Sequence, residues 1–380
     1  MNSDIPLALY VHIPWCVRKC PYCDFNSHEP KHGFDENKYV EALLKDLDFE
    51  LPQADSRPLQ SIFIGGGTPS LFSDAAIARL LLGIEARIAF VENIEITLEA
   101  NPGTADAGHF SGYRAAGVNR ISIGAQSFSA DQLRELGRIH NPAQIESAFI
   151  LAQQAGFDNI NLDLMFGLPG QSVEAATDDL QRAIALQPAH LSWYQLTLEP
   201  NTRFHHSPPA LPDEDTIAAM QEHGQQLIRE SGYQQYEVSA YASARRRCKH
   251  NLNYWEFGDY LGIGAGAHGK VSRDGSIKRR WRIKGPADYV QQAGSSGALS
   301  GEQRLVASDL GLEFMLNALR LNAGVRSKLF TERTGQPLSN LAKSIELAKK
   351  RELLEEDAEY LRATALGFRF LNDLVSCFNA

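Results

Sequence analysis

Short apolar segments alternate with amphipathic ones through the first half of the chain. Segments of strand length occupy residues 7–13, 61–65, 94–99 and 190–198, and two more end at Gly124 and Leu164. Helical periodicity separates them, over residues 34–51, from Ser73 onward, over 106–116 and over 173–186. This alternation predicts βαβ units with right-handed crossovers, and therefore an α/β fold with six parallel strands in a curled, barrel-like sheet.

Polar and glycine-rich residues follow these strands at the points where the strands end. They occupy residues 16–23, 65–70, 99–102, 124–126 and 163–169. In α/β barrels the chemistry lies at the carboxyl ends of the strands. We therefore expect these loops to converge on one mouth.

The second half of the chain changes in character after a helical segment at residues 213–231 and a short strand at 236–241. An aromatic, histidine-bearing and glycine-rich stretch covers residues 250–269, and residues 294–301 have the composition of a linker. Amphipathic periodicity returns at 306–321, 338–350 and 366–377, which predicts a small, mostly helical C-terminal domain. The expected divisions are a barrel over residues 1–235, an extension over 236–295 and the C-terminal domain over 296–380.

Composition and charge narrow the class of protein. The 380 residues are 43% hydrophobic, which supports a large globular core. The net charge of -9 argues against a nucleic-acid binder, despite a basic cluster from Arg245 to His250. Only Cys248 and Cys377 lie outside residues 16–23, so the sequence shows no disulfide framework and favours a reducing compartment. Because the first residues lack a secretory pattern, we expect a cytoplasmic protein. Transient association with a membrane is a secondary expectation.

Three cysteines, Cys16, Cys20 and Cys23, follow the first predicted strand within eight residues. Protein cysteines usually ligate all the irons of a [4Fe-4S] cluster, so a group of three would leave one iron open to a small molecule. A structural zinc site is an alternative, but it needs a fourth ligand such as His12 or His28 and usually has another spacing. Unrelated buried cysteines are a weaker alternative. The triplet therefore favours an iron-sulfur cluster.

The other motifs are individually weak. Residues 65–69 (GGGTP) let main-chain amides approach a ligand closely, yet glycine turns also simply connect strands to helices. Glu99 and Asp163 end strands, where a carboxylate can bind ribose hydroxyls or an amino group, cap a helix or form a salt bridge. Gln126 and Arg138 are no more specific, because polar residues are common in loops.

Taken in order, these motifs resemble the HemN/HemW branch of the radical S-adenosylmethionine (SAM) superfamily. The matching segments are Cys16 to Phe25, residues 65–69, Glu99 to Pro102, Gly124 to Phe128, Gly137 to His140 and Asn161 to Pro169. The resemblance covers nearly the whole chain, and the order and number of the segments carry more weight than any one of them. It implies a partial (β/α)6 radical SAM barrel with a HemN-type C-terminal helical domain.

The resemblance also implies cofactors. Cys16, Cys20 and Cys23 would ligate a [4Fe-4S] cluster, and SAM would chelate the remaining iron through its amino and carboxylate groups. The residues that match SAM contacts of the family are Tyr10, Tyr22, Gly66, Gly67, Thr68, Glu99, Gln126, Arg138 and Asp163. In this superfamily an electron from the cluster cleaves a carbon-sulfur bond of SAM and releases a 5'-deoxyadenosyl radical. The cofactors carry that step, and the protein orients and shields them.

Three features distinguish the branches of the family. The HemN branch contains oxygen-independent coproporphyrinogen III oxidases, which have a fourth cysteine where this chain has Phe25. They also have an N-terminal extension, whereas only nine residues precede Tyr10. Conversely, residues 250–255 (HNLNYW) match the His-Asn-x-x-Tyr-Trp signature of the HemW branch, whose members are haem chaperones. The resemblance thus favours a haem chaperone without coproporphyrinogen oxidase activity.

Membership of the HemW branch would add haem to the cofactors. His250 would be an axial ligand, Tyr254 and Trp255 would stack on the porphyrin, and residues 245–249 would pair with its propionates. The alternative is a core histidine beside a solvated basic loop. His268 is a further candidate contact on the haem or SAM side. The expected partners are haem and acceptor haem proteins such as membrane respiratory enzymes, and the loaded protein would form a homodimer.

Two enzyme activities remain as alternatives to haem delivery. The first is oxidation of coproporphyrinogen III, or another radical reaction on a tetrapyrrole. The second and weaker one is radical methylation of a small substrate, for which the sequence shows no additional suitably placed cysteine.

Overall fold

One mixed sheet of twelve strands extends through the chain from Leu7 to Arg304. The structure is a computed structural model, and it describes residues 5–30, 33–104 and 107–379. The strands of the large sheet are β1 (Leu7–Ile13), β2 (Leu59–Gly66), β3 (Phe90–Ala100), β4 (Arg120–Gln126), β5 (Ile160–Phe166), β6 (His190–Gln195), β7 (Gln234–Glu237), β8 (Ala240–Ala242), β9 (Asp259–Ile263), β10 (His268–Arg273), β11 (Ser276–Arg282) and β12 (Leu299–Arg304). A small second sheet pairs β13 (Val325–Arg326) with β14 (Tyr360–Leu361).

Helices connect the strands of the barrel and make up most of the C-terminal region. They are α1 (Glu36–Ala54), α2 (Asp74–Glu85), α3 (Ala107–Ala115), α4 (Ala130–Glu135), α5 (Pro142–Gln154), α6 (Val173–Ala185), α7 (Arg203–His206), α8 (Glu214–Glu230), α9 (Lys249–Trp255), α10 (Pro286–Gln292), α11 (Leu310–Ala318), α12 (Lys328–Thr334), α13 (Ala342–Lys350), α14 (Ala365–Arg369) and α15 (Leu371–Ser376). The helix start predicted at Asp106 lies outside the described residues.

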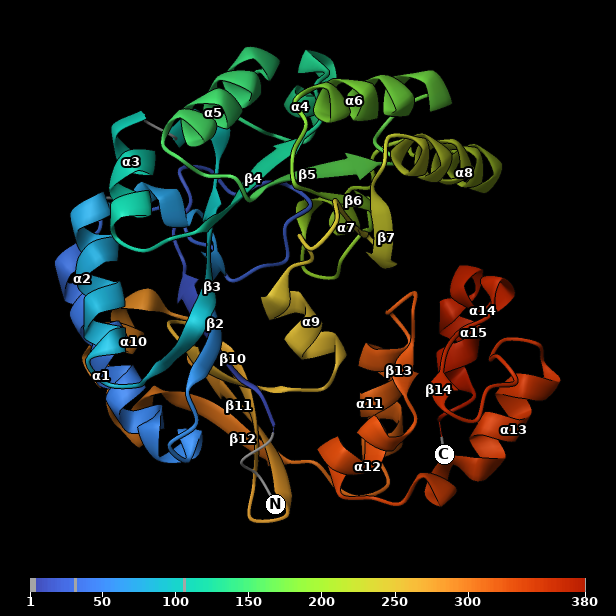
Figure 1. The fold of residues 1–380 in the computed structure, drawn as a ribbon. Helices are drawn as coiled ribbons and strands as arrows, with labels where there is room; N and C mark the ends of the chain where they lie inside the picture. The colour runs from blue at the N-terminus through green and yellow to red at the C-terminus, as the bar shows by residue number, and fades with distance from the viewer. Residues whose placement is uncertain (1–4, 31–32, 105–106, 380) are drawn as a thin grey trace.

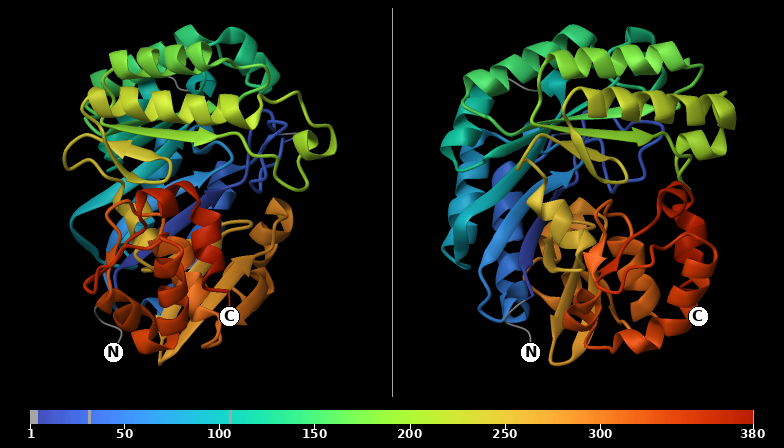
Figure 2. Two further views of the ribbon diagram at one scale, coloured as in Figure 1. Left: turned by 90° about the vertical axis from the view of Figure 1, so that its right-hand side faces the viewer. Right: turned by 45° about the vertical axis from the view of Figure 1, so that its right-hand side comes forward.

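The strand order of the large sheet is β12, β11, β10, β9, β1, β2, β3, β4, β5, β6, β8, β7. Strands β1 to β6 pair in parallel with their neighbours in sequence. Helices α1, α2, α3, α5 and α6 lie on the outside of the curved sheet, as Figures 1 and 2 show. The predicted partial (β/α)6 barrel and its six parallel strands are therefore confirmed.

The barrel strands are nearly continuous apolar runs because both of their faces are covered. In β1 every residue except Tyr10 is buried, and in β5 every residue except Asp163. The helices begin at polar caps, and α5 has a full capping box. In this box the Asn141 side chain accepts from the amide of Gln144, and the Gln144 side chain accepts from the amide of Asn141. Buried strands and capped helices thus alternate as the sequence pattern indicates.

The sheet continues beyond the barrel, which the sequence pattern did not predict. Strand β9 joins β1 in parallel, and β10, β11 and β12 follow as antiparallel strands. The prediction that residues 294–301 form a linker is wrong, because this segment forms a 3-10 turn and then the first part of β12. Gly301 in this strand packs against Trp281, whose ring would lie 2.2 Å from an added Cβ atom.

Residues 236–241 are predicted to form one strand, and they form parts of the hairpin β7–β8 instead. The predicted domain ranges stay a prediction.

The C-terminal region is mostly helical, as predicted. Helices α11 to α15 surround a separate cluster of buried side chains that includes Phe314, Phe330 and Leu374. The long helix predicted at residues 366–377 is divided into α14 and α15 at Phe370. This cluster also contains Phe257, whose ring lies 5.6 Å from that of Phe314. The segment that follows α9 therefore packs directly against the C-terminal helices.

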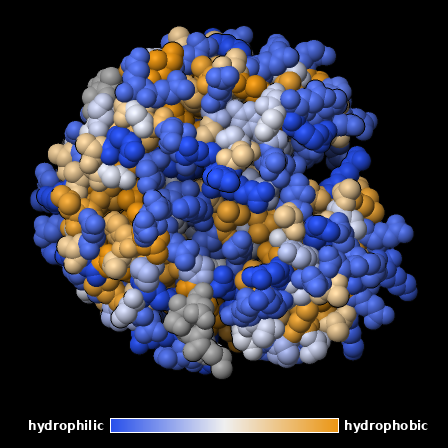
Figure 3. Space-filling model, viewed as in Figure 1, coloured by the Kyte–Doolittle hydropathy of each residue, from blue (hydrophilic) through white to orange (hydrophobic). Residues whose placement is uncertain are grey.

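Polar side chains cover most of the face of the molecule in Figure 3, and apolar ones gather at its centre and on the left. Within residues 5–30, 33–104 and 107–379, no helix is both long and apolar enough to cross a lipid bilayer. Single large apolar side chains are exposed at scattered positions, as is normal for a protein surface.

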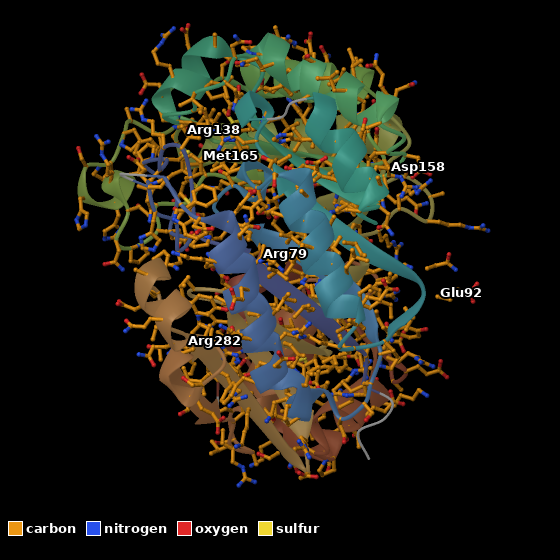
Figure 4. The ribbon with its side chains drawn as sticks, turned by 90° about the vertical axis from the view of Figure 1, so that its left-hand side faces the viewer. Arg79, Glu92, Arg138, Asp158, Met165 and Arg282 are labelled. Carbon is orange, nitrogen blue, oxygen red and sulfur yellow. The ribbon has the colours of Figure 1, made fainter. Side chains whose placement is uncertain are left out.

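A buried ion pair connects α1 to the antiparallel strands of the sheet. Arg282 at the end of β11 donates to Asp46 (Nε to Oδ1, 2.8 Å) and to Glu50 (Nη2 to Oε1, 2.7 Å) on α1. Tyr289 donates to the second oxygen of Asp46 (2.7 Å). The three charged side chains are buried, and Figure 4 shows Arg282 beside α1. This cluster holds the added strands against the barrel.

Arg282→Met should lower the free energy of unfolding by about 3–5 kcal/mol, because it leaves the buried Asp46 without its cation and leaves Glu50 with Arg280 alone. Urea unfolding followed by circular dichroism measures this loss. Arg246→Met is the matched control, since its more exposed pair with Asp158 should contribute about 1 kcal/mol or less. Equal losses in the two variants would contradict the importance of the buried cluster.

Candidate functional site

The loop of residues 14–28, here called the cysteine loop, leaves β1 and closes on itself. The amide of Cys16 donates to the carbonyl oxygen of His28 (3.0 Å), and the amide of His28 donates to that of Pro14 (2.7 Å). All three cysteines of this loop are half-buried. Their thiols are therefore held at the carboxyl end of β1.

The end of β2 is joined to the cysteine loop by two backbone hydrogen bonds. The amide of Gly67 donates to the carbonyl oxygen of Ile13 and that of Thr68 to Trp15, both at 2.7 Å. A Cβ atom on Gly67 would lie 2.4 Å from the Trp15 carbonyl oxygen, so this close approach requires glycine. The Thr68 hydroxyl donates to the Cys16 sulfur (3.5 Å). The glycine segment thus supports the first cysteine directly.

Two carboxylates lie at the ends of β3 and β5. The amide of Gly66 donates to Glu99 (3.0 Å), and Asp163 accepts from Ser122 (2.9 Å) and Asn161 (2.8 Å). Burial, followed by the charge of Asp163, raises the pKa of Glu99 to about 8. Burial also raises the pKa of Asp163. Because the neighbouring acids disfavour each other's charge, this pair is suited to a cationic or hydroxyl-bearing ligand.

A guanidinium group lies on the other side of the thiols. Arg138 donates to the carbonyl oxygen of Gly124 (2.9 Å) and to the Cys20 sulfur (3.6 Å), while its Nε is buried without a hydrogen-bond partner among the described residues. Gln126 has a left-handed backbone (φ 66°), and its side chain accepts from the Tyr194 hydroxyl (2.7 Å). Backbone strain of this kind is common at binding sites.

These side chains line one cavity of about 280 Å³, here called the cofactor cavity. Its lining includes eleven of the residues predicted to bind the cluster or SAM, which are Cys16, Cys20, Tyr22, Cys23, Gly66, Gly67, Thr68, Glu99, Gln126, Arg138 and Asp163. Tyr10 is the exception, because it lines a neighbouring cavity and its hydroxyl bonds to His12 (3.0 Å). Tyr194 and Asn101 also line the cavity and are not among the predicted residues, although both lie at strand ends as the predicted residues do.

The cofactor cavity occupies one end of the barrel. Figure 4 shows Arg138 and Met165 on the side where the strands finish, and Glu92 and Asp158 on the opposite side, where β3 and β5 begin. The five loops that the sequence pattern brings together therefore meet at the carboxyl ends, as in other α/β barrels.

The basic cluster of residues 245–249 lies at the opposite end of the barrel. Arg246 pairs with Asp158 (2.7 Å), and the Lys249 ammonium donates to the carbonyl oxygen of Asn93 (2.9 Å). These contacts place the cluster where strands begin, far along the barrel from the cysteine loop. Propionates bound there would put haem at the end that lacks the cysteines.

The residues of the cofactor cavity fit a [4Fe-4S] cluster. Burial raises the pKa of Cys16, and that of Cys23 to about 11, so both thiols are protonated at neutral pH until a metal displaces the proton. Among the described residues, no three His, Cys, Asp or Glu side chains are close enough together to hold a single metal ion. A [4Fe-4S] cluster does not need such a group, because each of its thiolates binds a different iron. His12 is not free to complete a zinc site, because Tyr10 and Asn26 bond to its two nitrogens.

The HNLNYW segment forms α9, and its histidine is inside the core. His250 is 1% exposed, and its ring nitrogens bond to the hydroxyls of Ser61 (3.0 Å) and Tyr254 (3.1 Å). Trp255 lies under the guanidinium of Arg320, with 4.4 Å from that group to the ring centre. Tyr254, by contrast, lines a cavity beside the cysteine loop. Iron ligation by His250 would require both of its hydrogen bonds to break, and it stays a prediction.

Comparison with known proteins agrees with the fold and identifies the family. A family model described as the radical SAM superfamily matches residues 10–183, and one described as the HemN C-terminal domain matches residues 305–370. The chain is 50% identical over 378 residues to "Heme chaperone HemW" of Haemophilus influenzae, covering 98% of each chain. It is 49% identical to "Heme chaperone HemW" of Escherichia coli, covering 99% of this chain and 98% of the relative.

A solved structure shares the complete fold. The structure of coproporphyrinogen III oxidase (HemN) from Escherichia coli, described as a radical SAM enzyme, matches with a TM-score of 0.84 and 24% identity. The match covers 100% of this chain and 91% of that one. The fold and the site thus define a radical SAM protein, and the superfamily implies a [4Fe-4S] cluster and SAM. Within it, the chain belongs to the HemW family, which confirms the resemblance stated from the sequence.

Gly67→Ala should lower the free energy of unfolding by about 1–3 kcal/mol, since the added methyl group would collide with the Trp15 carbonyl oxygen. It should also reduce the iron retained after anaerobic reconstitution. Urea unfolding and an iron assay measure the two effects. Gly103→Ala is the control, because the nearest heavy atom to its Cβ would be 3.4 Å away. Unchanged stability in Gly67→Ala would refute the close approach.

Stability should decrease in mild acid because His250 is buried in its neutral form. Burial, then the charge of Arg120, lowers the pKa of His250 to about 3 from 6.5. The unfolded chain therefore binds more protons below pH 6.5, and stability falls as the pH decreases from there toward 3.

His250→Gln should reduce this loss by about 2 kcal/mol between pH 6.5 and 5.0. Urea unfolding of the cluster-free protein at the two pH values measures the difference. His223→Gln, at an exposed position on α8, should leave the pH dependence as in the wild type. The same dependence in His250→Gln would show that His250 is not the titrating group.

Proposed function

We propose that this protein is a haem chaperone that holds a [4Fe-4S] cluster, binds SAM and haem, and delivers haem to an acceptor haem protein. The observation that carries the proposal is the similarity, over 98% of the chain, to relatives that are themselves named haem chaperones. Residues 250–255, which have the signature of that branch, support it from the sequence.

The cysteine loop also favours haem delivery over oxidation of a tetrapyrrole precursor. The oxidases of the HemN branch have a fourth cysteine at the position of Phe25, and a phenyl ring cannot bind iron or transfer a hydrogen atom as a thiol can. The Phe25 side chain is 59% exposed beside the cofactor cavity. The match to the HemN structure, at 24% identity, reflects a shared fold and does not favour shared chemistry.

The side chains of the cofactor cavity have distinct proposed roles. The three cysteines hold the cluster, one thiolate to each of three irons. Glu99 and Asp163 accept hydrogen bonds from the ammonium and hydroxyl groups of SAM, and Arg138 pairs with an anionic group beside Cys20. When bound, the cluster and SAM supply one-electron chemistry at this end of the barrel.

Haem is the proposed cargo, and the HNLNYW segment is proposed to contribute to its binding. Tyr254 lines a cavity next to the cysteine loop. His250 bonds to the Tyr254 hydroxyl from the core, and Trp255 is the last residue of the same helix. The finer assignments rest on the resemblance to the HemW branch. They are a cytoplasmic location, transient contact with membrane respiratory enzymes as haem acceptors, and a homodimer in the loaded state.

Adding haemin to the anaerobically reconstituted protein should produce a shifted Soret band that saturates at a fixed ratio of haem to protein. Mixing the loaded protein with an apo-haem protein should then move the Soret band to that of the acceptor. Absorbance spectroscopy measures both steps, with urea-unfolded protein as the control. A titration that matches free haemin would remove the basis of the proposal.

The oxidase alternative is tested on the same reconstituted protein. With SAM, a reductant and coproporphyrinogen III, product analysis should show no vinyl-bearing product beyond that of the cluster-free protein. Vinyl-bearing product that depends on SAM would reverse the ranking of the two functions.

A further inference from the structure

A second cavity, of about 660 Å³, lies against the cysteine loop on the side of β9 and β10. We call it the lateral cavity, and its lining includes Tyr10, Phe25, Tyr254, Tyr260, His268 and Lys284. Cys23 and Phe25 line the cofactor cavity as well. The two cavities are therefore neighbours that share part of the cysteine loop as a wall.

The dimensions and lining of the lateral cavity suit a large, flat, partly apolar ligand. Its volume lies within the range of about 300–1,000 Å³ that is typical of small-molecule sites. The rings of Tyr254 and Tyr260 pack edge to face at 4.4 Å, and the exposed Phe25 ring adds a third aromatic surface. Aromatic rings with a few polar groups are the usual lining of such sites.

The wall between the cysteine loop and β10 is fixed by hydrogen bonds. Asn26 donates to the carbonyl oxygens of Ala265 (2.9 Å) and Lys284 (3.0 Å), and its own carbonyl oxygen bonds to His12 (2.8 Å). The second nitrogen of His12 bonds to Tyr10. This wall is thus formed in advance and does not depend on a ligand for its shape.

Four imidazoles lie in or beside this region, and three have ring nitrogens engaged within the protein. Both nitrogens of His12 and of His250 are hydrogen-bonded, and Nε2 of His28 bonds to Asn26 (3.1 Å). His268 differs, because no described residue forms a hydrogen bond with its ring. It lines the cavity, is exposed and stacks on Trp281 with 6.2 Å between ring centres. It is the imidazole best placed to bind a metal in the cavity.

The charges around the lateral cavity suit a ligand that carries carboxylates. Lys19 and Lys284 line it together with one carboxylate, Asp24, and all three side chains are exposed, so cations outnumber anions there. The Lys19 ammonium donates to the carbonyl oxygen of Phe25 (3.2 Å), which directs it toward the aromatic wall. An iron porphyrin matches this combination, since it needs aromatic contact, a nitrogen ligand for iron and cations for its propionates.

We infer that the lateral cavity is the haem site, with His268 as an iron ligand and Lys19 and Lys284 as partners of the propionates. The inference rests on the proposed function and specifies where its cargo binds. Binding forms one bond between a neutral imidazole nitrogen and iron, displaces water from the metal and transfers no electron. His250 is a positioning residue that holds the Tyr254 ring at the cavity through its hydroxyl. Haem is thereby placed next to Cys23, at the carboxyl end of the barrel.

The experiment compares haemin titrations of the reconstituted wild type and His268→Ala. The variant should bind haem at least about tenfold more weakly, as loss of one metal ligand predicts, and its Soret band should lie elsewhere. Free imidazole should restore the wild-type band in His268→Ala, because it can fill the space left by the side chain. His223→Ala, exposed on α8, is the matched control and should titrate as the wild type.

Two further variants separate the roles of the other residues. Lys284→Ala should raise the Kd about threefold at low salt and less at high salt, as for one exposed ion pair. His250→Gln should weaken binding while it keeps the position of the wild-type Soret band, since the iron ligand is intact.

The outcomes distinguish the site from the function. If the wild type does not bind haem, the proposed function fails. If the wild type binds haem and His268→Ala gives the same band and affinity, only the lateral site is refuted. If free imidazole restored the wild-type Soret band in His250→Ala and did not restore it in His268→Ala, His250 would be the iron ligand instead.

Discussion

The pairing of β1 with β2 at their carboxyl ends is the contact on which the rest of the site depends. Two backbone hydrogen bonds, from Gly67 to Ile13 and from Thr68 to Trp15, hold the glycine segment against the start of the cysteine loop. They bring the Thr68 hydroxyl to Cys16 and leave the amide of Gly66 directed at Glu99. The thiols and the first carboxylate therefore have fixed positions before any cofactor binds.

The carboxyl ends of the barrel strands form the cofactor cavity, and the amino ends form contacts that attach later parts of the chain. At the carboxyl ends, polar groups converge on the cofactor cavity with raised carboxyl and thiol pKa values, a condition that favours ligand binding over stability. At the amino ends, Arg246 and Lys249 bond to residues that precede or begin strands. Those contacts attach the chain after β8 to the barrel. Charge alone would therefore mislead about which end binds an anionic ligand.

The sheet beyond the barrel gives the protein a second cavity. Because β9 pairs with β1 in parallel and β10 turns back against it, His268 comes to the same side as the cysteine loop. Helix α9 supports this arrangement from the core, with Tyr254 at the cavity and Trp255 against Arg320 of the C-terminal region. The HNLNYW segment is thus a structural connection between barrel and C-terminal region as well as a family signature. The hydrogen bonds of His250 to Ser61 and Tyr254 attach helix α9 to β2 and fix the Tyr254 ring.

By itself, the sequence determined the six parallel strands, the helical C-terminal region and, through its resemblance to a known family, eleven of the residues that line the cofactor cavity. The reason is physical: the carboxyl ends of parallel strands must meet at one edge of a sheet, so residues that follow those strands are brought together whatever their separation along the chain. Only the tertiary structure decided which histidines have their ring nitrogens hydrogen-bonded within the protein. His250 bonds to Ser61, 189 residues away, and no local pattern encodes that partner. The same holds for residues 294–301, where Gly301 packs on Trp281 in a strand and does not form a linker.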